Sequence, residues 1–155
     1  MADLTNKQKA TNFETLTHIC KVRDYVNVCI RELLRRGEEH DQTKLVNPEL
    51  DIFVEFTAKL AKCTYGSEEY EDNKTEMGVA LEHHYAHNRH HPEHYKNGLE
   101  DMNLIDMIEM FCDWKAASER HNDGNLRKSI EINGERFEMS EQLVKIFENT
   151  IEVFT

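Results

Sequence analysis

The stretch His40-Asp41-Gln42-Thr43-Lys44 is the part of the sequence around which we expect the fold to be organised. Adjacent His and Asp residues offer an imidazole nitrogen and a carboxylate oxygen, a mixed pair of ligands that suits Zn, Mn, Fe or Co. One further His and one further Asp, delivered from other helices, would complete a metal site.

Length and charge limit the classes of function. A chain of 155 residues suits one domain with a hydrophobic core, so we expect a single domain over residues 1–155. Thirty acidic and 19 basic residues give a net charge of -11 with His neutral. Such a surface repels nucleic-acid backbones, which argues against a polymeric nucleic-acid partner. A small phosphorylated ligand is compatible, because a bound metal reverses the local field.

Cysteine usage and hydropathy indicate a cytoplasmic protein. The four cysteines (Cys20, Cys29, Cys63 and Cys112) form no C-x-x-C pair, and buried free thiols in a reducing compartment are the simplest interpretation. The sequence contains no apolar run of about 18 residues and no signal-peptide core at its N-terminus. We therefore expect neither a membrane partner nor secretion.

Apolar residues recur with a helical period over most of the chain, which predicts a mainly α-helical fold. The expected helices cover residues 12–36, 48–62, 72–88 and 103–120, and Gly37 is expected to end the first one. A loop is expected over residues 121–125.

The C-terminal part is expected to contain a small β-hairpin and a last helix. Residues 128–138 alternate in polarity around Asn133-Gly134, a pair typical of a type I′ turn. Residues 140–154 then form a helix that covers the core. Its apolar side could also serve a homo-oligomer.

Two polar residues lie on apolar helix faces. His18 shares a face with Val22 and Tyr25, and Asp113 falls on the buried side of the helix over residues 103–120. A neutral core histidine and a salt-bridged carboxylate are the structural alternatives to metal ligands. We favour ligands, because a buried carboxylate requires a cation, a metal or several donors. Asp106 and Glu109 are either supporting residues or solvated.

Six histidines fall within twelve residues, far above chance: His83, His84, His87, His90, His91 and His94. His84 shares the helical stripe of Met77, Ala80 and Leu81, whereas His83 is turned about 100° away. Pro92 biases His91 towards an extended conformation. A solvated His-rich tract is the alternative, but this placement favours the wall of a site.

With these residues in place, the sequence resembles the HD-domain superfamily of metal-dependent phosphohydrolases. The pattern of that superfamily matches His18, His40-Asp41, His84 or a neighbour, His90 or His91, and Asp113, over a core of residues 12–120. The stretches HDQTK, EHHYAHNRHHPEHY and EMFCDWKAA look like an uncharacterised branch from bacteria and their phages. The resemblance implies an HD-like helical bundle in a bacterial cell or a phage-infected host.

The resemblance also implies a reaction and a set of site residues. Metal-activated water would cleave a phosphate ester of a small molecule, with a nucleotide as the favoured class. One or two divalent ions (Mn, Zn, Co or Fe) would be bound by His18, His40, Asp41, His84 and Asp113. The expected catalytic residues are Lys44, His84, His90 and His91.

Lys44 marks a departure from some nucleotidases of the superfamily. They carry an acid three residues after the His-Asp pair, where this chain has Lys44. Lys44 could neutralise a phosphate oxygen, and a histidine of the cluster could protonate the leaving oxygen. A surface lysine is the alternative interpretation.

Two other functions remain compatible with the sequence. Some members of the superfamily hold two irons with the same ligands and a lysine after the His-Asp pair, and oxidise a substrate with O₂. Alternatively, the metal could be structural in a non-catalytic helical protein that binds a nucleotide.

Overall fold

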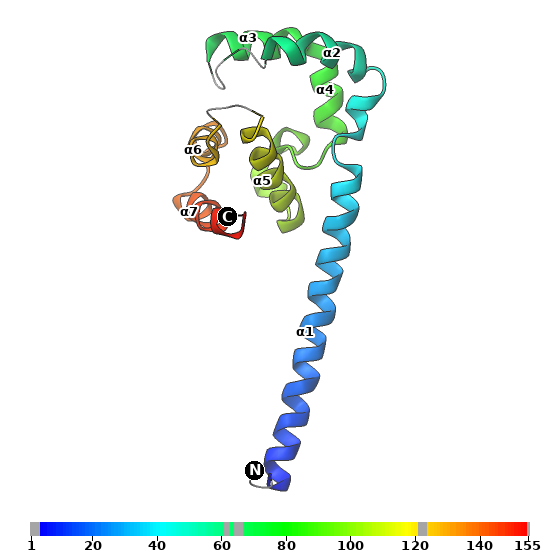
Figure 1. The fold of residues 1–155 in the computed structure, drawn as a ribbon, viewed down its shortest axis with the longest axis vertical. Coiled ribbons are helices and arrows are strands. Elements are labelled where there is room, and N and C mark those ends of the chain that lie inside the picture. Colours follow the sequence, from blue (N-terminus) through cyan, green and yellow to red (C-terminus); the bar gives the residue numbers. More distant parts are fainter. Residues whose placement is uncertain (1–3, 61–62, 64–66, 121–123, 155) are drawn as a thin grey trace. The chain divides into compact units, whose positions relative to one another are not determined.

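The computed structural model describes residues 4–60, 63, 67–120 and 124–154, and regular structure within these ranges is entirely helical (Figure 1). The prediction of a mainly α-helical protein is therefore confirmed. The chain divides into two compact units, residues 1–38 and 39–155. One domain over residues 1–155, with the fold of an HD domain, stays a prediction.

The first unit contains α1 (Asn6–Glu39) except for its last residue. The predicted end at Gly37 is wrong, because α1 continues through it. One glycine costs a helix only about 1 kcal/mol, which a helix of 34 residues tolerates. The apolar stripe at Val22 and Tyr25 has no packing partner within residues 4–38. Among the described residues, neither α1 nor any other helix combines the length and apolarity needed to cross a membrane.

The second unit begins with a short 3₁₀ helix, η1 (Gln42–Leu45), and then α2 (Glu49–Leu60), which contacts both α3 (Glu68–Glu76) and α4 (Gly78–His87). The single helix predicted over residues 72–88 is thus two helices. They meet at Gly78, whose φ of 41° lies in the left-handed region that glycine adopts without a Cβ clash. The predicted helix end near Lys62 lies outside the described residues.

Two more 3₁₀ helices, η2 (Pro92–His94) and η3 (Gly98–Asp101), lead into α5 (Leu104–Ser118). A capping box starts α5. The Asn103 side chain accepts a hydrogen bond from the Asp106 N–H, and the Asp106 carboxylate accepts one from the Asn103 N–H, at 3.1 Å each. The prediction for this helix is confirmed to within two residues at either end.

The predicted β-hairpin over residues 128–138 is wrong, because these residues belong mostly to α6 (Leu126–Arg136). The buried side of α6 recurs with a helical period at Leu126, Ile130, Asn133 and Gly134. Gly134 allows a close approach to α7 (Glu141–Thr150), since a Cβ atom there would lie 3.3 Å from Val144 Cγ2. The Asn-Gly pair therefore serves helix packing. Of the expected loop, residues 121–123 lie outside the described ranges.

The main hydrophobic core of the second unit lies where α5, α6 and α7 meet (Figure 1). The last helix, predicted over residues 140–154, is present as α7 followed by η4 (Ile151–Phe154), and it covers this core. The buried residues are Met102, Met110, Phe111, Leu126, Ile130 and Phe147. This core fixes α5, the helix that carries the acidic side of the site described below.

Candidate metal centre

Three segments of the second unit bring histidines and carboxylates together. His40 and Asp41 precede η1, and Asp41 has a left-handed backbone with φ of 57°, which Asp tolerates better than most residues. His84 lies in the last turn of α4. His90 and His91 follow in the turn before η2, and His91 is extended, as its position before a proline predicts.

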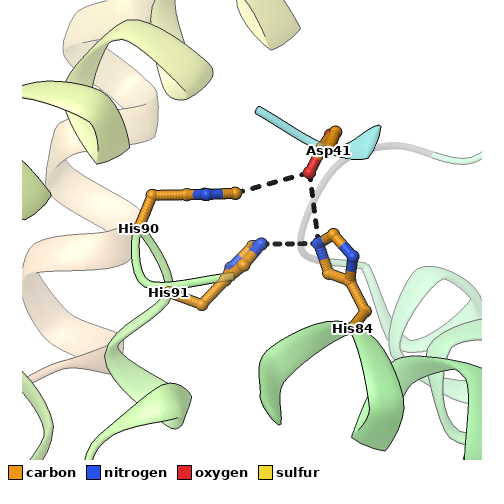
Figure 2. Close-up of side chains that lie close together, drawn as sticks. All are labelled: Asp41, His84, His90 and His91. Atoms are coloured by element: carbon orange, nitrogen blue, oxygen red, sulfur yellow. Dashed lines mark hydrogen bonds and ion pairs between the residues drawn. The ribbon is translucent and has the colours of Figure 1, made fainter. Parts of the chain in front are cut away.

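Four of these side chains converge on one point (Figure 2). Nε2 of His84 lies 2.9 Å from Nε2 of His91 and 3.4 Å from Oδ1 of Asp41. Nε2 of His90 lies 3.6 Å from the same Oδ1. One ligand atom from each of the four residues lies within 4.8 Å of the other three.

Two polar atoms at this point are buried without a hydrogen bond. Oδ1 of Asp41 and Nε2 of His90 have no hydrogen-bond partner among the described residues. His90 as a whole is only 1% exposed. A buried polar atom left unpaired costs about 1–3 kcal/mol, so the arrangement calls for a ligand that satisfies both atoms.

The spacing of the four residues fits a metal ion. Ligand atoms at 2.0–2.1 Å from a tetrahedral ion lie about 3.4 Å from one another. Three of the six distances between these atoms are 2.9, 3.4 and 3.6 Å, close to that value, and all six are within 4.8 Å. Three imidazoles and one carboxylate are a donor set suited to Zn, Mn, Fe or Co. The cluster of Asp41, His84, His90 and His91 could therefore hold a metal.

The second carboxylate oxygen of Asp41 faces a different group of residues. Its Oδ2 lies 3.5 Å from Nε2 of His40 and accepts a 2.6 Å hydrogen bond from Nζ of Lys44. Nε2 of His40 is also 3.6 Å from Oδ1 of Asp113, on α5. His40, Asp41 and Asp113 form a second set that could hold a metal. The structure thus brings four of the five predicted ligands, and Lys44, into one neighbourhood.

Two buried glutamates contact the Nδ1 atoms of the histidines, the ring nitrogens other than those that lie near Asp41. Glu49, which is fully buried at the start of α2, accepts from Nδ1 of His83 at 2.7 Å and of His84 at 3.0 Å. Glu109 on α5 accepts from Nδ1 of His40 at 2.9 Å, and Nδ1 of His90 lies 3.2 Å from the same oxygen. The sequence left Glu109 open between a supporting and a solvated position. Glu49 was missed, because an acid in a first helical turn is ordinary.

Burial and the local charges together set the protonation of the cluster. Burial, followed by the charge of Lys44, lowers the pKa of His84. Burial is also the main cause that lowers the pKa of His91, followed by the charge of His90. Burial alone would raise the pKa of Asp41, but the charge and the hydrogen bond of Lys44 bring it below its ordinary value. At neutral pH these residues therefore present lone pairs and one negative charge.

His40 differs from the other histidines. Burial alone lowers its pKa, but the carboxylates of Asp113, Glu109 and Asp41 outweigh burial and raise the pKa to about 10. In the metal-free protein, His40 is therefore a cation at neutral pH. It balances the acidic groups on the α5 side of the site, as Lys44 balances Oδ2 of Asp41.

The other residues that the sequence singled out lie elsewhere. His18 is on α1, in the first unit, and its role as a ligand stays a prediction. His87 donates to the His83 carbonyl and His94 to the Tyr85 carbonyl, so both serve the local backbone. Asp106 is fully buried and paired with Arg89, which gives it a structural role.

A family model matches residues 7–153, nearly the whole chain, and it describes a family of unknown function, DUF5662. The chain belongs to the DUF5662 family. No curated protein and no solved structure matches it. The DUF5662 match spans both units and every residue of the candidate centre, so the site lies within the part of the chain that defines the family.

Proposed function

We propose that this DUF5662 protein is a metal-dependent phosphohydrolase that cleaves a phosphate ester of a small molecule. One observation carries the proposal: Oδ1 of Asp41 and Nε2 of His90 are buried, unpaired and 3.6 Å apart. Nε2 of His84 stands 3.4 Å from the same oxygen. Such a set is costly without a cation and well suited to one.

The residues divide into metal ligands and groups for the substrate. Asp41, His84, His90 and His91 would hold a divalent ion (Mn, Zn, Co or Fe), and His40 with Asp113 would complete a second position on Oδ2 of Asp41. A metal bound there polarises a phosphate oxygen and makes water a better nucleophile near neutral pH.

Lys44 is the group best placed to receive a phosphate. Its Nζ lies 2.6 Å from Oδ2 of Asp41 and 5.0 Å from the ring centre of Phe53, and its side chain is 30% exposed. An ammonium beside the ligands neutralises a phosphate oxygen and the charge that develops on it during cleavage. A histidine of the cluster at residues 83–94 could give a proton to the leaving oxygen.

The substrate class follows from charge and from the resemblance to HD phosphohydrolases. A net charge of -11 disfavours a long polyanion, whereas the cationic site can accept a small one. A nucleotide is the favoured substrate, because nucleotides are common substrates in that superfamily. Tyr85, whose ring centre is 4.9 Å from that of His91, offers an aromatic face near the centre.

The proposal is tested by metal analysis followed by a phosphate-release screen. The purified protein is analysed for bound metals and then assayed against nucleotides and simple phosphate esters with Mn, Co, Zn or Mg. We expect stoichiometric metal and release from one class of ester, and loss of both in Asp41→Asn. Metal without release from any ester would instead favour a structural centre.

A redox function is the second candidate, and the contact between Lys44 and Asp41 favours it. A lysine after the His-Asp pair is also the pattern of the HD-type di-iron oxygenases that the sequence resembles. Two firmly bound irons, a visible absorption band and O₂ consumption would support this function. A colourless protein that releases phosphate with Mn or Zn would contradict it.

A further inference from the structure

Two glutamates outside the predicted ligand set contact the histidines around Asp41. Glu49 is 0% exposed and contacts His83 and His84, and Glu109 is 8% exposed and contacts His40 and His90. In every contact the histidine uses Nδ1. The Nε2 atoms of His40, His84 and His90 are the ones that lie near Asp41.

Hydrogen-bond counting fixes which atom of His84 carries the proton. Nδ1 of His84 lies 3.0 Å both from Oε2 of Glu49 and from Nδ2 of Asn88. Asn88 has two N–H donors, and the structure gives both better acceptors: Oγ1 of Thr43 at 2.9 Å and the His84 carbonyl at 2.8 Å. Nδ1 of His84 therefore donates to Glu49.

The contacts of Glu49 agree with this assignment. Its Oε1 lies 2.7 Å from Nδ1 of His83, and its Oε2 accepts from the Thr43 hydroxyl at 3.0 Å and lies 3.0 Å from Nδ1 of His84. An ionised carboxylate only accepts hydrogen bonds, so it selects the Nδ1–H form of a neutral histidine. Nε2 of His84 is then left with a lone pair aimed at His91 and Asp41.

Glu109 has the same arrangement on the α5 side. Its Oε1 accepts from Nδ1 of His40 at 2.9 Å and lies 3.2 Å from Nδ1 of His90. The rings of His40 and His90 lie against each other, with centres 4.3 Å apart. Glu109 thus holds His40 by a hydrogen bond, while Nδ1 of His90 lies close to the same oxygen without a hydrogen bond; the Nε2 atoms of the two histidines lie near different oxygens of Asp41.

We propose that Glu49 and Glu109 are positioning residues of the metal centre: Glu49 holds Nδ1 of His84 and Glu109 holds Nδ1 of His40, so that the Nε2 atom of each histidine faces the ion. The proposal rests on the metal centre proposed above but not on the reaction assigned to it. Carboxylates behind ligating histidines fix ring orientation and raise ligand basicity, and their loss costs about 10- to 100-fold in metal affinity.

The first test measures metal affinity in variants of Glu49. We expect Glu49→Leu, which removes both acceptor oxygens at similar volume, to weaken Zn or Co binding about 10- to 100-fold in a chelator competition. Glu49→Gln retains one acceptor oxygen, so we expect a smaller loss of metal affinity. The control is Asp106→Asn, which alters an equally buried carboxylate that contacts Arg89 and Tyr95 instead of a histidine of the cluster.

Each outcome of this test is decisive. Unchanged affinity in Glu49→Leu would overturn the proposal. An equal loss in Asp106→Asn would also overturn it, because the effect would then be general destabilisation. Circular dichroism establishes that each variant is folded. If Glu49→Leu does not fold, Glu49→Gln carries the test, with an expected loss of about tenfold.

The second test reads the tautomer directly, which a merely structural role would not change. Long-range ¹H–¹⁵N NMR of the metal-free protein should show His84 in the Nδ1–H form. In Glu49→Leu, Nδ1 loses its carboxylate acceptor while Nδ2 of Asn88, an N–H donor, still lies beside it, so we expect His84 to shift to the Nε2–H form. A wild-type His84 in the Nε2–H form would overturn the proposal.

The two proposals fail in different ways. A wild-type protein that binds no metal would overturn both the positioning role and the proposed function. Metal binding that weakens as expected in Glu49→Leu, without release from any phosphate ester, would overturn the reaction and support the positioning role.

Discussion

Nζ of Lys44 lies 2.6 Å from Oδ2 of Asp41, on the carboxylate oxygen opposite the one that faces His84 and His90. The two oxygens of one aspartate therefore have different environments. Oδ1 is buried without a hydrogen bond, and Oδ2 already has a cation. This division separates binding of a metal from binding of a phosphate.

Replacing Lys44 by methionine should separate these two functions. Lys44→Met leaves Oδ1 of Asp41 in place and removes a competing cation, so we expect metal affinity to be retained or increased. Turnover of the phosphate ester should fall about a hundredfold, the usual cost of losing a group that stabilises developing charge. Chelator competition and steady-state kinetics measure the two effects. A parallel loss of metal would show that Lys44 mainly holds Asp41 in place.

Asp41 is expected to be essential for metal binding. Asp41→Asn retains the shape but removes the negative charge, and we expect the bound ion to be lost. A metal at a hundredfold its dissociation constant stabilises a protein by about 2.7 kcal/mol. Thermal unfolding with and without metal should show this gain in the wild type alone. An equal gain in Asp41→Asn would refute the ligand assignment.

His91 and His94 form a matched pair for testing the cluster. His91 lies 2.9 Å from His84, whereas Nδ1 of His94 donates to the Tyr85 carbonyl outside the cluster. We expect His91→Gln to weaken metal binding at least tenfold, in line with the loss of a contact that orients or binds the ion. His94→Gln should leave metal affinity near that of the wild type. Isothermal titration of the metal-free proteins makes the comparison, and similar affinities would remove His91 from the ligand set.

The raised pKa of His40 predicts a pH-dependent contribution to stability in the metal-free protein. A histidine with a folded pKa of about 10 stabilises the fold fully below its unfolded pKa, near 6.5. That stabilisation is lost as the pH rises through 10. The free energy of unfolding lost in His40→Gln should therefore be largest near pH 6 and small above pH 10. Denaturant titrations with a chelator present measure it, and a loss that is independent of pH would contradict the charge balance described for His40.

A substitution at Gly134 distinguishes the observed helix α6 from the β-hairpin that the sequence predicts over residues 128–138. In a type I′ turn, alanine at this position would be forced to a positive φ, whereas in α6 it has a helical backbone and gains about 0.5–1 kcal/mol of propensity. The close contact with Val144, at 3.3 Å from a Cβ atom, offsets part of this gain. We expect Gly134→Ala to change the free energy of unfolding by less than about 1 kcal/mol. A larger loss of stability in a denaturant titration would favour a turn at Gly134 and contradict the packing of α6 against α7.

The sequence singled out the histidines of the cluster but not their supporting residues. The helical stripe favoured His84 over His83, whereas the choice between His90 and His91, just before Pro92, stayed open. Glu49 and Glu109 carry no such signal, since an acid at the start of α2 or within α5 is equally typical of a solvated surface. Their burial depends on how the helices pack, which local periodicity does not contain.

The hairpin error has a similar origin. Asn133-Gly134 is a strong local signal for a turn, but Leu126, Ile130 and Asn133 also follow a helical period. Packing against α7 favours the helix, and a glycine that would serve a turn allows close contact between α6 and α7. Tertiary contacts thus override a local preference for a turn.

Asp41 and His84 meet across about forty residues of chain, an excursion that contains α2 and α3. An ion held between them would act as a removable cross-link that closes this loop and limits the conformations open to the unfolded chain. The only cysteine between Asp41 and His84 is Cys63, a free thiol, so no disulfide closes this loop. Metal supply would then govern how often α2 and α3 open, and hydrogen exchange in these two helices should slow when the ion is added.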